Sequence, residues 1–146
     1  MAGTTYDMVN EVERLGDIKT GLNYLYIKID FSKTPVSASG DNWKIARIRD
    51  GWLFKGSYFR MATDSTSAAT IDVGTTEDAT DLDSAIDVDG GTQTAWTVMT
   101  PTDAVPVEVS ADGYIWLDFN SAAISDGMIE FLFTILAEPG SDSETD

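Results

Sequence analysis

The sequence contains no cysteine and no histidine. Without cysteine there is no disulfide framework and no thiol chemistry. Without histidine the commonest general base and the commonest transition-metal ligand are both missing. Neither a phosphate-binding glycine loop nor a nucleophile-elbow motif is present. We therefore expect a protein that is not an enzyme and that holds neither a cofactor nor a metal ion.

Basic residues are absent from the second half of the chain. All nine lie between Arg14 and Arg60, and residues 1–60 also carry seven acidic side chains. Residues 61–146 carry eighteen acidic side chains and no basic one. A net charge of −16 repels phosphates, so we expect no nucleic-acid partner. Unless the fold interleaves the two halves, the surface should be electrostatically two-sided, although ordinary solubility is the simpler explanation of the acidity.

Long hydrophobic runs are also lacking, so we expect no membrane partner. The 146 residues are 42% hydrophobic, which is enough to bury the core of one domain. We divide the chain into an N-terminal arm over residues 1–21, a β-domain over residues 22–137 and an acidic flexible tail over residues 138–146.

The arm has the apolar spacing of a short helix. Met8, Val12 and Leu15 fall on one helical face, and Gly16 is placed to end the helix. A helix of about ten residues is marginal in water unless a surface supports it. The arm therefore packs either on its own domain or on a neighbouring subunit.

From Asn23 onward the hydrophobic period changes from that of a helix to two, which predicts half-buried strands. Strands are expected near residues 23–31, 43–49, 52–62, 70–73, 94–100, 105–109, 114–119 and 128–136. Asp50-Gly51 is typical of a tight hairpin turn, and apolar residues on both faces indicate a central position for 52–62. Nine side chains are predicted to be buried: Leu25, Ile27, Ile29, Ile115, Leu117, Phe119, Ile129, Phe131 and Phe133.

Seven or eight short strands with turn signals about every ten residues predict an all-β fold. We expect an antiparallel β-sandwich or a jelly-roll-like fold with a short N-terminal arm.

Residues 75–91 form the most acidic segment, and we expect a solvated loop there. Asp81, Asp83, Asp87 and Asp89 are hard-oxygen ligands that suit Ca²⁺, but the order of an EF-hand loop is absent. The loop is therefore interpreted as solvated rather than as a calcium site.

The four tryptophans lie within strand patterns. Packing in the core or at an interface explains Trp43, Trp52, Trp96 and Trp116 better than a sugar-stacking platform does.

Several segments resemble a family of small tailed-phage virion proteins. They are DFSK at Asp30 to Lys33, then KIARIRDGWLFKGSYFRM, ATIDVGTTEDATDLDSAIDV and ISDGMIEFLFTIL. The resemblance covers roughly residues 29–137. This chain has Asp50-Gly51 where the family often has Ala-Gly, a neutral change for a turn. The family is similar to capsid decoration and head-stabilising (cement) proteins, and it implies binding to a shell with no catalytic residues.

The resemblance and the charge distribution lead to one hypothesis. The protein is expected on the exterior of a virion capsid, bound to the major capsid protein through the arm and the basic residues, with self-association into a homo-oligomer. A trimer is expected because shells offer local three-fold sites. A lectin-like surface module and a head-to-tail or tail component remain alternatives. The expected contact residues with capsid or sister subunit are Tyr6, Met8, Val12, Arg14, Leu15, Lys19, Lys28, Lys44, Arg47 and Arg49.

Overall fold

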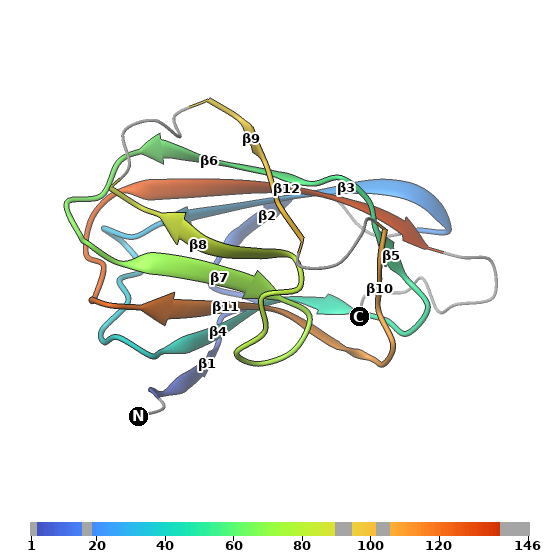
Figure 1. Cartoon of the computed structure of the whole chain (residues 1–146), viewed down its shortest axis with the longest axis horizontal. Coiled ribbons are helices and arrows are strands. Elements are labelled where there is room, and N and C mark those ends of the chain that lie inside the picture. The colour runs from blue at the N-terminus through green and yellow to red at the C-terminus, as the bar shows by residue number, and fades with distance from the viewer. Residues whose placement is uncertain (1–2, 16–18, 90–94, 102–105, 138–146) are drawn as a thin grey trace.

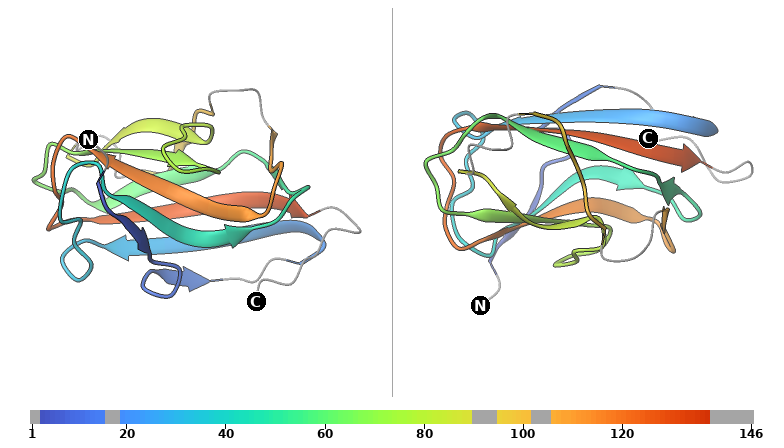
Figure 2. Two further views of the ribbon diagram at one scale, coloured as in Figure 1. Left: turned by 90° about the horizontal axis from the view of Figure 1, so that it is seen from below. Right: turned by 45° about the horizontal axis from the view of Figure 1, so that its top comes forward.

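The computed structural model describes residues 3–15, 19–89, 95–101 and 106–137, and within them every regular element is a β-strand. Two sheets pack face to face, as Figure 1 and the right-hand view of Figure 2 show. In this part of the chain there is no helix long and apolar enough to cross a membrane. The predicted all-β sandwich is confirmed.

Sheet A has five strands in the order β1-β4-β11-β7-β8. The bounds are β1 Thr5–Asp7, β4 Asn42–Ile48, β11 Gly113–Asn120, β7 Thr70–Gly74 and β8 Asp83–Asp87. Every neighbouring pair is antiparallel except β1 with β4, which is parallel.

Sheet B has seven strands, with the order β10-β5-β12-β3-β2 along its main path. Their bounds are β10 Val107–Glu108, β5 Leu53–Phe54, β12 Met128–Ala137, β3 Gly21–Asp30 and β2 Glu13–Leu15. Two further strands, β6 Tyr58–Thr63 and β9 Thr97–Val98, continue the sheet, with β6 beside β12 and β9 beside β6.

The pairing of the strands is nested. β3 pairs with β12, β4 with β11, β5 with β10, β6 with β9 and β7 with β8, all antiparallel. The chain from β3 to β12 is thus one long hairpin with its tip between β7 and β8. Contacts of β11 with β7 and of β12 with β5 and β6 close this hairpin into two sheets. A rolled double-sheet hairpin is the jelly roll, so the jelly-roll alternative is the correct one.

The core lies between the two sheets and follows the predicted alternation. All nine side chains predicted to be buried are at most 2% exposed. In one part of the core Trp43 packs edge-on against Phe119 with ring centroids 4.8 Å apart, and Phe31 lies 6.2 Å from Trp43. In another part the rings of Phe131 and Phe133 stack at 5.6 Å. Aromatic pairs in these geometries stabilise the core beyond the effect of their buried area.

The prediction of a helix in the N-terminal arm is wrong. β1 adds to the edge of β4, and β2 adds to the edge of β3, so the arm crosses from one sheet to the other along one side of the sandwich (Figure 2, left). The Thr4 amide donates to Asp41 Oδ1 at 3.0 Å. Between the strands Val12 is buried in the core and Met8 packs against it. The free edges of β4 and β3 offer the arm backbone partners that an isolated short helix lacks.

The Asp-Gly signals mark turns, but the hairpin expected at Asp50-Gly51 does not form. Asp50-Gly51 leads from β4 in sheet A to β5 in sheet B, and Asp112-Gly113 leads from β10 in sheet B to β11 in sheet A. Gly51 has φ +90°, a conformation that glycine adopts without steric cost. A local turn signal therefore indicated where the chain reverses and not which strands pair.

The expected strand over 52–62 is two strands, β5 and β6, both beside β12. Around the break, the Lys55 amide donates to the Thr134 carbonyl at 2.8 Å and the Thr134 amide donates to Ser57 Oγ at 3.1 Å. Gly56 lies inside the break, in keeping with the tendency of glycine within a strand pattern to mark a bulge or a close backbone approach.

The acidic segment is not a loop throughout, because β8 pairs with β7. The strand expected over 94–100 is reduced to β9, and the edge strand expected over 105–109 is β10. Thr94, Val105, Gly16 and the tail 138–146 lie outside the described residues.

Candidate interaction surfaces

The outer face of sheet A carries a group of four side chains that we name the cation–aromatic cluster: Lys44, Arg47, Tyr114 and Trp116. The Lys44 ammonium lies 4.7 Å from the ring centroid of Tyr114 and 5.5 Å from that of Trp116. The Arg47 guanidinium lies 5.8 Å from the Tyr114 ring. Neither cation forms an ion pair with a carboxylate among the described residues. Their charge is therefore available to a partner.

A β-bulge builds this cluster. Lys44 is opposite Trp116 and Arg47 is opposite Tyr114, while Ile45 has no partner on β11. In a regular strand two residues three positions apart face opposite sides of the sheet. Because of the extra residue, the side chains of Lys44 and Arg47 lie on the same side of the sheet, and Ile45 and Ala46 are both buried.

Two shallow hollows adjoin the cluster at the start of β11. One, of about 210 Å³, is lined by Arg47, Arg49, Asp112 and Tyr114 among others. The second, of about 340 Å³, extends from Tyr114 and Trp116 to the loop at Thr75 to Glu77. Arg49 lies 4.0 Å from the Asp112 carboxylate, which also accepts the Asp50 amide at 2.9 Å. The hollows offer shape for a protruding side chain of a partner.

The other half of the same face is acidic. Burial raises the pKa of Asp118, and the nearby charges of Asp78, Asp72 and Glu77 raise it further. Asn120 donates to Asp72 Oδ2 at 3.0 Å. The outer face of sheet A therefore changes from cationic beside β4 to anionic beside β7.

The outer face of sheet B carries one neutralised polar network. Glu130, only 8% exposed, accepts hydrogen bonds from the Tyr26 hydroxyl and from Arg60 Nε, the latter at 2.5 Å. Burial raises the pKa of Glu130, but the hydrogen bonds and the charge of Arg60 outweigh it, so that the net shift is downward. Burial and Glu130 raise the pKa of Tyr26 to about 12. Arg60 in turn lies 4.9 Å from the ring of Trp96.

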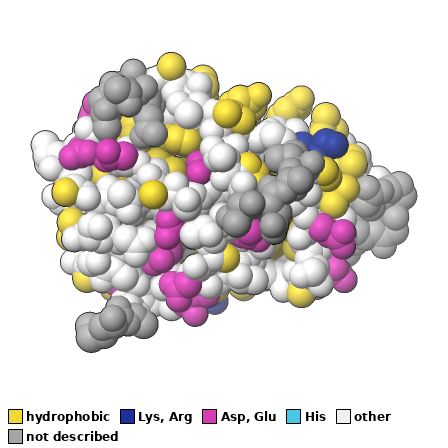
Figure 3. All heavy atoms as spheres, viewed as in Figure 1, with side chains coloured by type: hydrophobic (Ala, Val, Ile, Leu, Met, Phe, Trp, Pro, Cys, Tyr) yellow, Lys and Arg dark blue, Asp and Glu magenta, His cyan; other side chains and the backbone are white. Residues whose placement is uncertain are grey.

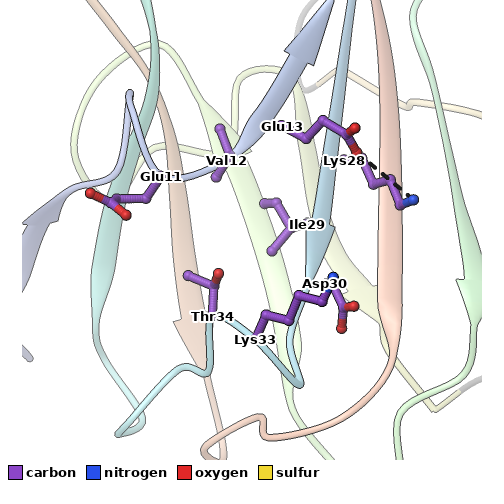
Figure 4. Close-up of a pocket in the computed structure, with 8 residues that line it drawn as sticks. All are labelled: Glu11, Val12, Glu13, Lys28, Ile29, Asp30, Lys33 and Thr34. Atoms are coloured by element: carbon purple, nitrogen blue, oxygen red, sulfur yellow. Dashed lines mark ion pairs between the residues drawn. The ribbon is translucent and has the colours of Figure 1, made fainter.

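A third hollow, of about 360 Å³, lies at the seam between the arm and β3 (Figure 4). Lys28 pairs with Glu13 across this seam at 3.8 Å. The Asp30 carboxylate accepts the Ser32 hydroxyl at 2.6 Å and the Ser32 amide at 3.0 Å, and these bonds lower its pKa. The polar groups of the hollow thus hold the arm and the following turn in place.

The carboxylates of the acidic segment, residues 75–91, have different hydrogen-bond partners and environments. Asp81 accepts hydrogen bonds from the amide and hydroxyl of Thr75, whereas Asp83 is buried and accepts the Ser84 amide. Burial raises the pKa of Asp83. The neighbouring Asp87 raises the pKa of the exposed Asp89. Within the described ranges no three potential metal ligands converge.

The expected contact residues occupy several parts of the surface. Tyr6 and Lys19 are exposed, Lys28 is paired with Glu13, and Val12 is buried. The side chains of Arg14 and Leu15 lie outside the description. The structure brings Lys44, Arg47 and Arg49 together, on β4 and just beyond it. Val12 and Lys28 meet at the seam hollow instead. Sequence reasoning missed Tyr114 and Trp116, whose outward alternation with Ile115 and Leu117 was the available signal.

The fold interleaves the two halves of the chain. Nested pairing sets β4 of the basic half beside β11 of the acidic half, and β3 and β6 beside β12. Lys28, Arg49 and Arg60 each meet a carboxylate. The charge asymmetry of the sequence therefore does not become a basic side and an acidic side of the molecule.

Comparison with protein-family models and with curated proteins gives no match. Among solved structures, a chain described as "Cyanophage Pam1 capsid asymmetric unit" is similar, with a TM-score of 0.61 and 19% sequence identity. The similarity covers 86% of this chain and 94% of that chain. At this identity it shows a shared fold, over nearly the whole length of both chains.

Proposed function

We propose that this protein is a phage virion protein that binds the outside of an icosahedral capsid and stabilises it, as a decoration or cement protein does. The observation that carries the proposal is the shared fold with a chain of a capsid asymmetric unit, matched over nearly its full length. A jelly roll alone serves many functions, including viral capsids and lectins. The resemblance of residues 29–137 to tailed-phage virion proteins supports the capsid role.

The mechanism is binding without chemistry. A protein that bridges neighbouring shell subunits draws its free energy from interface area, multiplied by symmetry and avidity. The rigid sandwich suits this role because its aromatic core and nested strand pairing hold the outer faces in fixed positions. The major capsid protein is the proposed partner.

The cation–aromatic cluster is the proposed shell-contact site. Tyr, Trp and Arg are enriched where protein interfaces concentrate their binding energy. Lys44 and Arg47 carry charge that no described carboxylate neutralises, and the adjoining hollows accept protruding side chains. The acidic half of sheet A then remains toward solvent.

The test is reconstitution on particles that lack this protein. Occupancy is measured by electron cryomicroscopy, and shell stability by the temperature of DNA release. We expect near-full occupancy with the wild type and a strong loss with Lys44→Glu/Arg47→Glu, an effect that shrinks as salt rises. Lys33→Glu/Lys55→Glu is the matched control, since it changes the net charge equally at exposed positions. Failure of the wild type to bind any capsid overturns the function; equal loss with both double variants overturns the site.

The lectin-like alternative is distinguished in the same preparation. Glycan-array binding by the free protein that disappears on Trp116→Ala, without capsid binding, would favour it. Recovery of the protein from tail-only particles would favour a tail component. The trimer expected from the sequence stays a prediction.

A further inference from the structure

The outer face of sheet B carries a contiguous apolar surface that no described element covers. Of the six large hydrophobic side chains that are exposed in the described residues, five belong to this face. Their exposed fractions run from 41% to 61%. They are Leu22, Tyr24, Tyr58, Trp96 and Val98. Figure 3 shows hydrophobic side chains gathered along the upper part of the molecule, where sheet B lies.

Strand register makes these side chains neighbours. Val98 is opposite Tyr58, and Tyr58 is opposite Leu132, so one apolar row crosses three strands. A second row runs from Leu53 through Leu136 to Leu22. Tyr24 lies next to this second row on β3. Side chains opposite one another in a sheet lie about 5 Å apart, so the rows form one surface. We name it the apolar face of sheet B.

We propose that the apolar face of sheet B is a self-association surface, on which a second copy of this chain packs through the same face about a two-fold axis. The inference stands independently of the proposed capsid function, because it rests on the burial, strand register and charge of the described residues.

The charge of the face favours a second copy as its occupant. Each copy carries −16, so most other contacts between copies would oppose carboxylates to carboxylates. On this face the outward Glu130 lies between two cations, Arg60 and Lys28, and binds Arg60. Lys28 in turn pairs with Glu13, so these four charges balance. Two copies that meet here bring neutral surface against neutral surface.

The extent of the face also suits a dimer. The three aromatic side chains alone expose roughly 300 Å², given about 200 Å² for a whole aromatic side chain. Leu22 and Val98 add to this, and apolar area of several hundred Å² marks an interaction site. With its half-buried leucines, the apolar part of the face supplies roughly half of the about 800 Å² that each partner contributes to a standard interface.

Symmetry sets the copy number. A face that meets its own copy gives an isologous, two-fold contact, whereas a ring of three needs two different surfaces. Sheets also pack face to face at about 10 Å when their facing side chains are apolar. The contact therefore makes a dimer rather than the trimer expected from the sequence. The two cation–aromatic clusters then lie on opposite sides of the pair, as a bivalent bridge requires.

Sedimentation equilibrium of the full chain tests the proposal over micromolar to millimolar concentration. We expect a monomer–dimer equilibrium that tightens as added salt screens the net charges. Tyr24→Asp should weaken the dimer about tenfold or more, because it places a carboxylate on the apolar face of each copy at its most exposed aromatic position. Ser84→Asp is the matched control: it adds the same carboxylate at an exposed position of sheet A and should leave the mass distribution unchanged.

Each other outcome overturns the proposal. A monomer at all concentrations excludes the second copy as occupant, and a trimer excludes the two-fold contact. A dimer weakened equally by both variants excludes this face. If the protein is monomeric in solution and Tyr24→Asp abolishes capsid binding, the face binds the shell instead. Circular dichroism and urea unfolding of both variants check that neither change unfolds the domain.

Discussion

The two outer faces of this sandwich arise from the same alternation of residues, yet they have different chemistry. On sheet A the cations Lys44 and Arg47 lie over aromatic rings, and the carboxylates are collected on the neighbouring strand β7 and its loop. On sheet B the cations Arg60 and Lys28 pair with the carboxylates of Glu130 and Glu13, and exposed hydrophobic side chains lie beside these pairs. One face presents cations that pair with no described carboxylate, whereas the other presents paired charges and apolar surface.

This difference shows that the cross-strand neighbours of an outward residue determine whether its charge is paired. Arg60 and Arg47 are both outward cations in strands of the basic half. Register places Glu130 opposite Arg60 and Tyr114 opposite Arg47. The same residue type therefore becomes a neutralised network on one sheet and an available charge on the other.

The largest loss of stability should come from a substitution in the core beneath sheet B, and not from one on either outer face. Phe131→Ala should lower the free energy of unfolding by about 3–5 kcal/mol, because a fully buried aromatic leaves a cavity. Leu132→Ala, the adjacent outward position, should cost about 1 kcal/mol or less. Urea unfolding measures both, and equal costs would show that the inward and outward positions of β12 are wrongly assigned.

The next largest effect concerns the network that neutralises sheet B. Glu130→Gln removes the charged acceptor of Tyr26 and Arg60 and should cost about 1–3 kcal/mol at pH 7. Because the folded-state pKa of Glu130 is lowered from 4.5, its charged form contributes to the stability of the folded protein above pH 4.5. This contribution should be lost as pH falls through the folded-state pKa. Unfolding of wild type and variant between pH 7 and pH 3 measures this, and a pH-independent difference contradicts it.

A smaller effect is expected on the cationic half of sheet A. Lys44→Gln should cost about 0.5–1 kcal/mol, the contribution of an exposed cation over an aromatic ring. Lys33→Gln, an exposed lysine with no ring beneath it among the described contacts, is the control and should be close to neutral. Chemical denaturation at equal ionic strength measures the free energy of unfolding of both variants. Equal losses would argue against a cation–aromatic contribution.

The smallest effect should be a gain, on the acidic half of sheet A. Burial and three neighbouring carboxylates raise the pKa of Asp118, so its charged form is unfavourable in the folded state. A raised pKa contributes stability at low pH that is lost as pH rises through the folded-state value. Asp118→Asn should therefore stabilise the protein at pH 7 by less than about 0.5 kcal/mol. The gain should disappear toward pH 4, and thermal unfolding at both pH values checks its sign.

Local pattern predicted a large part of the fold. The alternation of Leu25, Ile27 and Ile29, and that of Ile129, Phe131 and Phe133, correctly identified the inner sides of β3 and β12. An inward apolar residue and an outward polar one follow from a period of two whatever the partner strand is. Turn positions such as Asp50-Gly51 were correct for a related reason, because glycine tolerates the required φ locally.

The candidate sites were less accessible to sequence reasoning. Lys44 and Arg47 were named as contacts for their charge, but their common face depends on the bulge at Ile45 and on Trp116 and Tyr114, about 70 positions away. The apolar face of sheet B joins residues from β3, β5, β6, β9 and β12. No local window contains such a surface.

In the N-terminal arm, the local sequence pattern and the tertiary contacts favour different structures. Its spacing of Met8, Val12 and Leu15 suits a helix, but Val12 enters the core from a turn between two strands. The edges of β4 and β3 provide backbone hydrogen-bond partners on both sheets, which outweigh the weak propensity of a short helix.

By itself the sequence determined the strand periodicity, the buried residues, the turn positions and the absence of thiol and imidazole chemistry. All of these depend on residue type and on steric rules that act within a few positions. Only the tertiary structure decided the nested pairing, the course of the arm, the interleaving of charge and the character of the two outer faces. These depend on which distant strands become neighbours, and backbone pairing is insensitive to the side chains that it brings together.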